Sequence, residues 1–151
     1  MTKFLLAVHV LAAIVAVGPV TVAASMFPPL ARKVPADPGE SLLNLALLHR
    51  ICRVYAVVGV AVPVFGFATA KNMGVLGDAW LIVSIALTAV AAVVLGALVL
   101  PRQGAVLRSV EDGVLDARAT VRLAMVTGIF NLLWAAVTVL MIVRPGSTTG
   151  A

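Results

Sequence analysis

Apolar residues gather into four long runs separated by short charged segments. The runs cover residues 4–26, 51–70, 79–100 and 123–143. Each is close to the length of about 20 residues with which an α-helix crosses roughly 30 Å of hydrocarbon. None alternates apolar and polar residues with the period of two that a transmembrane strand requires. The pattern predicts an all-α, polytopic membrane protein: one four-transmembrane-helix bundle over residues 1–144, followed by a flexible tail at 145–151.

Proline, glycine and polar residues mark where these runs should end. In chain order, the runs close at Phe27-Pro28-Pro29, Lys71-Asn72, Pro101-Arg102 and Arg144-Pro145-Gly146. Proline opposes helix continuation because it lacks an N–H and its ring crowds the preceding turn. We therefore expect the first helix to stop near Met26 and the third near Leu100.

Two of the helices are expected to be longer than the membrane. Asp37-Pro38-Gly39-Glu40 has an acidic N-cap, proline at the first helical position and glutamate at the third, which is a helix-start signature. It predicts a second helix over 38–70, about 50 Å long at 1.5 Å per residue. For the fourth helix, Ser109 and Asp116 are alternative starts. Both helices would extend past the bilayer on the same side, into the cytoplasm.

Glycine and proline positions suggest local features within the spans. Pro63 removes a backbone bond to Gly59 and should kink or loosen the second span there. Arg53 precedes Gly59 by the same interval as Arg122 precedes Gly128, which is compatible with an internal duplication. The interpretation we prefer is that both glycines are ordinary close-packing positions between helices.

Composition agrees with lipid as the surrounding solvent and excludes several kinds of site. The chain of 151 residues is 62% apolar and 11% charged, whereas soluble domains are about half apolar and a quarter charged. The single cysteine, Cys52, excludes an intramolecular disulfide and any multi-cysteine zinc site. The five methionines are scattered, and no catalytic, nucleotide-binding or metal motif is evident, so we expect no metal site and no catalysis.

The basic residues are distributed unevenly about the four spans. Of the 11 lysines and arginines, eight fall in the segments 28–53 and 101–122, and three lie at the termini or between the second and third spans. Because cytoplasmic loops carry the excess of Lys and Arg, we expect a multi-pass plasma-membrane protein with both termini outside. The charged loops 28–50 and 101–122 would be cytoplasmic. Bases at span ends do not form a nucleic-acid-binding face, so no nucleic-acid partner is expected.

The N-terminal run has an alternative interpretation as a cleaved signal peptide over residues 1–24. Lys3 and the small residues Val22-Ala23-Ala24 fit that pattern. The apolar stretch is longer than the usual core of such a signal, about 7–15 residues. We therefore expect the first run to be a span.

His9 is the one ionisable side chain well inside a span. Ala12, Ala16, Pro19 and Ala23 share its helix face, and small residues at that spacing let a neighbouring helix approach. Intramembrane ionisable groups are functional candidates, so His9 is a candidate haem or metal ligand or proton-transfer group. The alternative is a neutral imidazole that hydrogen-bonds across helices to Asn131 or Thr127.

A second basic group surrounds the other histidine. It is expected at the cytoplasmic interface, in contact with lipid head groups, and comprises His49, Arg50, Arg53, Arg118 and Arg122. His9 and His49 would differ in depth by about 20 Å across a core of roughly 30 Å. That separation excludes a single haem iron held by both histidines.

Polar residues in the fourth span form a third candidate. Thr127, Asn131 and Trp134 share a face, as polar residues that join helices commonly do. A substrate pocket would give the same pattern. Trp80 and Tyr55, near span ends, fit interfacial anchors.

The N-terminal segment resembles that of a known group. Lys3-Phe4-Leu5-Leu6-Ala7-Val8-His9-Val10-Leu11-Ala12-Ala13, followed by Gly18, resembles a bacterial family of predicted integral membrane proteins of unassigned function. That family is similar to the copper-resistance D and membrane protoporphyrinogen oxidase types. These families place a histidine early in the first helix of a small bundle, and the resemblance implies that His9 corresponds to it. The third span here lacks the further basic residue that the oxidase type pairs with its histidine.

Three functions remain open from the sequence. The leading hypothesis is a small membrane protein without its own catalysis, acting as a binding module or a subunit beside copies of itself or other membrane proteins. The alternative is a haem- or redox-linked protein that uses His9. A small-solute transporter is the third, although no pair of broken polar spans is visible.

Overall fold

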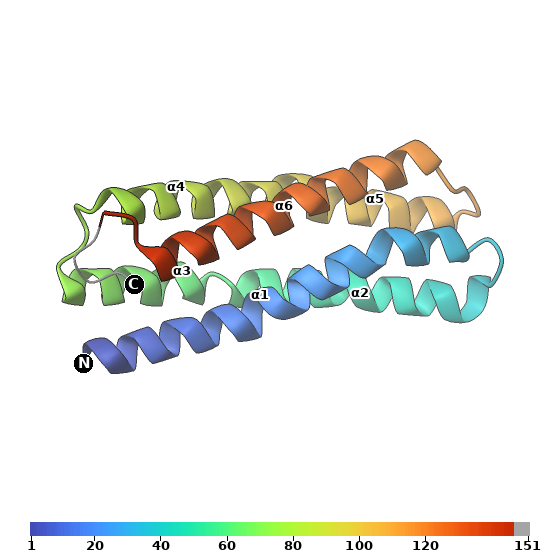
Figure 1. Ribbon diagram of the computed structural model, residues 1–151. Helices are drawn as coiled ribbons and strands as arrows, with labels where there is room; N and C mark the ends of the chain where they lie inside the picture. Colours follow the sequence, from blue (N-terminus) through green and yellow to red (C-terminus); the bar gives the residue numbers. More distant parts are fainter. Residues whose placement is uncertain (147–151) are drawn as a thin grey trace.

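A computed structural model describes residues 1–146, and every regular element within them is helical (Figure 1). The elements are α1 (Thr2–Lys33), α2 (Pro38–Val58), α3 (Ala61–Met73), α4 (Ala79–Val93), a π-helical segment η1 (Val94–Val99), α5 (Leu100–Glu111) and α6 (Ala117–Val143). α2 continues into α3, and α4 continues through η1 into α5. The four resulting helices are each long and apolar enough to cross a membrane. The prediction of an all-α chain with four apolar spans is confirmed.

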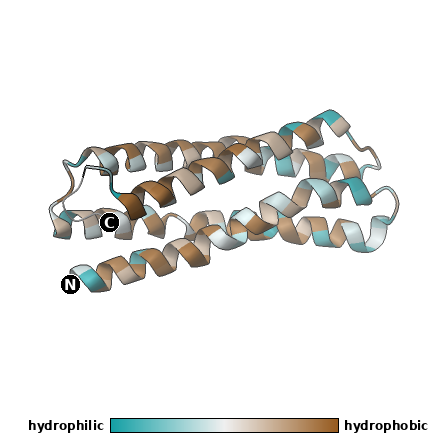
Figure 2. Ribbon diagram, in the orientation of Figure 1, coloured by the Kyte–Doolittle hydropathy of each residue, from teal (hydrophilic) through white to brown (hydrophobic). Residues whose placement is uncertain are grey.

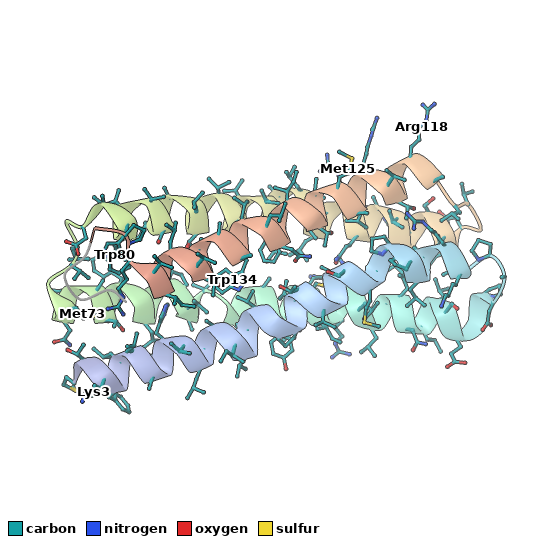
Figure 3. The ribbon with its side chains drawn as sticks, viewed as in Figure 1. Lys3, Met73, Trp80, Arg118, Met125 and Trp134 are labelled. Atoms are coloured by element: carbon teal, nitrogen blue, oxygen red, sulfur yellow. The ribbon has the colours of Figure 1, made fainter. Side chains whose placement is uncertain are left out.

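The four helices run alternately up and down (Figure 1). The N-terminus, the α3–α4 turn and the C-terminal end of α6 lie at one end, called the termini end below. The turns at 34–37 and 112–116 lie at the other, called the turn end. Hydrophilic residues concentrate at the turn end (Figure 2). Lys3 and Trp80 therefore lie far from Arg118 (Figure 3).

The main core lies in the turn-end half and extends towards the middle of the bundle. Phe27, Leu45 and Leu123 are completely buried there. Towards the termini end, α3 packs on α1 and α4 packs on α6. Around the middle of the bundle, large apolar side chains point outwards, with Val57 74% and Leu132 73% exposed. Such a surface suits a hydrocarbon solvent, in which apolar side chains need no cover.

α1 does not end where its prolines were expected to end it. The helix passes through Pro28 and Pro29 and continues to Lys33. Phe27, Pro28 and Ala31 are all buried, so packing in the bundle holds this segment helical despite the missing N–H donors. Prolines are tolerated where neighbouring helices support the chain. The prediction that the first helix closes at Phe27-Pro28-Pro29 is wrong.

The third helix also continues beyond Leu100, where it was expected to stop. The fourth helix does not begin at Ser109, the earlier of its two predicted starts. The N–H of Leu100 donates to the carbonyl of Leu95, five residues earlier, as in a π-helix; the π segment ends at Val99, two residues before Pro101. The wider π turn accommodates Pro101, which has no N–H to donate. The helix then continues as α5 to Glu111. Ser109 lies in its last turn and does not start α6.

Asp116 is the cap that starts the fourth helix. Its Oδ1 accepts from the N–H groups of Arg118 at 3.0 Å and Ala119 at 3.2 Å. The second helix thus has its predicted length, and the fourth begins at the later of its two predicted starts. The third helix is longer than predicted, because it continues beyond Leu100. The charged segments 28–50 and 101–122 are mostly helix, with only short turns between them.

The second helix begins and breaks as expected. Asp37 is the N-cap position and Pro38 the first helical residue, although no side chain caps this end by a hydrogen bond. α2 and α3 are separated at Gly59 and Val60, one turn before Pro63. The interruption of the second helix that was expected near Gly59 is therefore present.

Candidate functional site

His9 lies inside the bundle, between α1 and α3. Only 9% of its surface is exposed, and its Nδ1 lies 2.9 Å from the carbonyl oxygen of Val62. Because a carbonyl oxygen only accepts, Nδ1 is the donor of this bond, and in the neutral imidazole Nε2 then has the free lone pair. The expectation that His9 faces the bundle is confirmed. The expected partners, Asn131 and Thr127, are wrong, because α3 rather than α6 packs on this face.

A glycine makes room for the His9 ring. A Cβ atom added to Gly66 would lie 2.8 Å from Cε1 and 3.1 Å from Nδ1 of His9, closer than real side chains allow. Gly66 is one turn after Val62 on α3, so the same face supplies both the acceptor and the space. This arrangement fixes the orientation and tautomer of the imidazole, as a backbone carbonyl does for many metal-ligating histidines.

His49 belongs to a buried chain of hydrogen bonds near the turn end. Its Nδ1 lies 3.0 Å from Oε1 of Gln103, Nε2 of Gln103 donates to Sγ of Cys52 at 3.5 Å, and Sγ donates to the Val20 carbonyl at 3.9 Å. With Nδ1 of His49 as the first donor, all three contacts pair a donor with an acceptor. The chain joins α2 to α5 and to α1.

The surroundings of His49 show that part of its ring has a partner in the interior. Gln103 and Cys52 are completely buried, and the His49 ring meets that of Phe27 edge-on, with centroids 6.4 Å apart. One edge of the imidazole therefore contacts buried side chains. His49 is half-buried rather than a purely interfacial side chain, because the interior amide of Gln103 offers its ring a partner.

Four of the arginines lie deeper along the helices than the acidic residues of the same end. Glu40, Glu111 and Asp116 lie in or beside the first and last turns of the helices there. Arg50, Arg53 and Arg122 are exposed and lie further from the turns. These three residues form a layer of positive charge between the acidic tips and the uncharged part of the helices, called the arginine layer below.

Arg102 joins this layer from α5. It is partly buried, and its Nη1 is closed off from solvent and has no hydrogen-bond partner. A buried guanidinium N–H without an acceptor is costly. The sequence indicates only that Arg102 is one of the basic residues that follow the third apolar run.

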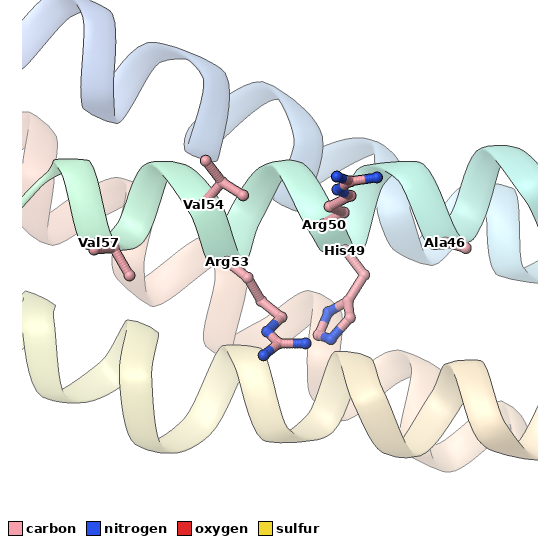
Figure 4. Close-up of a pocket in the computed structure, with 6 residues that line it drawn as sticks. All are labelled: Ala46, His49, Arg50, Arg53, Val54 and Val57. Carbon is pink, nitrogen blue, oxygen red and sulfur yellow. The ribbon is translucent and has the colours of Figure 1, made fainter.

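A groove of about 540 Å³ runs along α2 at this layer. It is lined by Ala46, His49, Arg50, Arg53, Val54 and Val57. Figure 4 shows His49 and Arg53 pointing together from α2 towards the neighbouring helix. The groove therefore has basic side chains in its middle and valines towards α3. We call it the α2 groove.

The predicted polar cluster on α6 is only partly assembled. Nδ2 of Asn131 donates to Oγ of Ser25 on α1 at 3.0 Å, so Asn131 joins two helices as expected. The hydroxyl of Thr127 is buried without a partner, as is Oδ1 of Asn131. Trp134 is half-buried on the same helix, and its backbone carbonyl accepts from Thr138.

Trp80 lies inside rather than at a lipid-facing position. It is buried beside Ala70 and Leu81, and its Nε1 donates to Oδ2 of Asp78 at 3.1 Å. The Arg144 guanidinium lies 5.6 Å from its ring centroid, at a distance typical of a cation–π contact. Trp80 thus ties the start of α4 to the end of α6, and its ring is packed inside the bundle.

Sequence reasoning missed Gly66, Gln103 and Ser25. Gln103 is one of the few polar residues beyond the third span, but it falls on the inward face only if the helix continues through Pro101. Gly66 carries no signal until the face of α3 that meets His9 is known. Among residues 1–146, no group of three or more His, Cys, Asp or Glu side chains is placed to hold a metal ion.

The chain was compared with protein-family models, with curated proteins and with solved structures, and none of these comparisons gave a match. The resemblance of the first helix to a bacterial membrane family therefore stays a prediction.

Proposed function

We propose that this chain is a multi-pass protein of the plasma membrane, with both termini outside and the turn end in the cytoplasm. The carrying observation is the charge asymmetry: eight of the 11 basic residues belong to the half of the bundle that contains the turn end. The basic side of a membrane protein is retained in the cytoplasm. Four apolar helices of sufficient length support the placement.

The arginine layer would mark the cytoplasmic boundary of the hydrocarbon. Along their helices, Arg53 lies about 30 Å from Met73, and Arg122 lies about 32 Å from Val143, at 1.5 Å per residue. These distances match a hydrocarbon core of roughly 30 Å. The first half of α2 and most of α5 would then project into the cytoplasm as an extramembrane extension of the bundle.

Within that membrane frame, we propose that the chain is a binding module or complex subunit without catalysis of its own. Two polar groups already join helices: His49, Gln103 and Cys52 bond to one another in the interior, and Asn131 bonds to Ser25 at the surface. The cytoplasmic projection would offer a charged surface beside exposed leucines such as Leu43, which is 74% exposed. A surface of that kind suits a partner or a second copy.

The subunit role is tested by mass in a near-native membrane. The tagged chain, at its native expression level, is cross-linked in cells and extracted with surrounding lipid in polymer nanodiscs. We expect a defined species heavier than the single 15.5 kDa chain. A species that contains only one chain, with or without cross-linking, would contradict the subunit role while leaving the membrane placement intact.

His9 carries a second candidate, a haem- or redox-linked function. The observation that favours it is the fixed imidazole: Nδ1 is held by Val62, Gly66 gives the ring its space, and Nε2 keeps a lone pair. The donor set is a single histidine nitrogen, so a bound haem would receive one protein ligand from this site. The detergent-purified chain should then show Soret absorbance that His9→Ala removes. A spectrum without it, together with unchanged metal content in the variant, argues against a haem.

A further inference from the structure

We propose that the α2 groove binds one acidic glycerophospholipid, with its phosphate between Arg50 and Arg53 and the start of one acyl chain along Val54 and Val57. The proposal rests on the membrane placement argued above, but it does not depend on which face is cytoplasmic. It goes beyond general contact with head groups, because it assigns a single site, a headgroup charge and a chain direction.

The first argument is uncompensated charge. Arg50 and Arg53 are one helical turn apart and both line the groove, so their side chains start from neighbouring positions on the helix surface and can reach a common anion. No acidic residue occurs between Glu40 and Asp78 in the sequence, and Glu40 is about 15 Å from Arg50 along α2. Two neighbouring arginines without carboxylates favour an anion, and guanidinium groups bind phosphate by charge-assisted hydrogen bonds.

The second argument is the order of side chains along the groove. From the turn end towards α3, the lining passes from Ala46 through the basic residues to Val54 and Val57. The basic part lies at the arginine layer, and the valines lie on the side of the uncharged helix (Figure 4). A phospholipid has the same order, with its phosphate at the interface and its acyl chains towards the bilayer centre. A free phosphate ion has no apolar part that could contact the two valines.

The third argument is that one wall of the groove is held in place. His49 lines the groove, and its Nδ1 is bonded to the buried side chain of Gln103. Its Nε2 lies 3.8 Å from where a Cβ of Gly104 would be, so the ring sits over the backbone of α5. A lipid would therefore meet a preorganised wall, which lowers the entropy lost on binding.

A second hollow at the turn end provides a matched control. It is lined by Ala117, Arg118, Val121 and Arg122, so it holds two arginines at the same end of the molecule. It belongs to the first two turns of α6 and has only one valine. Replacing both of its arginines removes the same charge as in the α2 groove without touching the proposed site.

The experiment is a lipid titration followed by native mass spectrometry. The full chain in zwitterionic detergent is mixed with dioleoylphosphatidylglycerol or dioleoylphosphatidylcholine, and the fraction carrying one lipid is measured. We expect at least tenfold preference for the anionic lipid. The double variant Arg50→Gln/Arg53→Gln should bind it ~25-fold more weakly, since each base near an anionic lipid contributes about fivefold. The control Arg118→Gln/Arg122→Gln should change binding less than threefold.

Three results would overturn the lipid site: equal binding of the two lipids, an equal loss in both double variants, or displacement of phosphatidylglycerol by millimolar inorganic phosphate. The last would assign the groove to a free anion. Circular dichroism of each variant verifies folding, and the single variants Arg50→Gln and Arg53→Gln give a second reading, about fivefold each. Retention of the wild type in vesicles after an alkaline wash tests the membrane placement separately. Loss from the vesicles would refute the proposed function, whereas retention without lipid preference would refute only this site.

Discussion

At the scale of residues, two histidines that look alike in the sequence have different surroundings. His9 is held by a backbone carbonyl and given space by Gly66, whereas His49 is held by the side chain of Gln103. Interhelical hydrogen bonds in a membrane are individually modest, about 0.6 kcal/mol on average. The cost of removing one partner is larger, because the other buried group is then left unsatisfied.

Gly66→Ala should destabilise the bundle by about 1 kcal/mol, because the new Cβ displaces the His9 ring from Val62. Thermal unfolding in detergent measures the loss. Gly18→Ala, on the same helix as His9 and with nothing within 4 Å of its added Cβ, should be neutral or slightly stabilising.

A double-mutant cycle identifies the cause of the Gly66→Ala effect. In a His9→Ala background, Gly66→Ala should cost little, since no ring remains to be displaced. An undiminished cost in that background would mean that the glycine serves helix packing and not the histidine.

Gln103→Leu should destabilise the chain by about 1–2 kcal/mol, because it leaves Nδ1 of His49 and Sγ of Cys52 without their partner. Asn44→Leu is the matched control, an exposed amide on α2 replaced by the same residue. Unfolding midpoints of the two variants are compared in the same detergent. Equal midpoints would show that the hydrogen-bond chain contributes nothing to stability.

At the scale of elements, proline had different consequences in three helices. α1 continues through Pro28 and Pro29, the third helix adopts a π segment before Pro101, and the second helix separates one turn before Pro63. The residue type is the same in each case, but the neighbouring elements differ. Buried neighbours hold α1, and a wider turn relieves the third helix.

Pro63→Ala should join α2 and α3 into one regular helix. The new N–H at position 63 can donate to the carbonyl of Gly59, so the backbone amides of residues 60–62 should exchange with deuterium more slowly than in the wild type. Mass-spectrometric hydrogen exchange in detergent measures this, with the peptide over 64–70 as the internal reference. Unchanged exchange at 60–62 would mean that the break is imposed by packing against α1 and not by the proline.

At the scale of the whole molecule, the alternating topology collects both charged turns at one end (Figure 1, Figure 2). The acidic residues there lie at the tips, and Arg50, Arg53, Arg102 and Arg122 lie further in, so positive charge lies at the level at which we place lipid phosphates. Exposed apolar side chains surround the remainder of the bundle. The same asymmetry that sets the proposed orientation also positions the α2 groove.

Impermeant maleimide labelling tests the orientation. Cys52 is completely buried, so it is unsuited as a reporter and is replaced by serine. Single cysteines are then placed at the exposed positions Ala36, in the α1–α2 turn, and Asn72, near the end of α3. In intact cells, Asn72→Cys should label at once, and Ala36→Cys only after permeabilisation. The reverse pattern would invert the proposed topology.

The sequence by itself determined the number of spans, their helical nature and the direction of the charge asymmetry. These properties follow from local composition and run length, which depend little on what each residue later contacts. It also located the α2 start at Pro38 and the break near Gly59, because proline acts on its own turn. The flexible tail predicted at 145–151 falls mostly on residues 147–151, which lie outside the described residues.

Only the tertiary structure decided which helices continue past their prolines, what His9 and His49 bind, and that Gly66 and Gln103 matter. Each of these depends on the rotation of one helix against another. A run of apolar residues specifies such a rotation poorly, because in lipid every face of the helix is acceptable to the solvent. Close packing between helices fixes it, and with it the placement of the few polar groups that the interior contains.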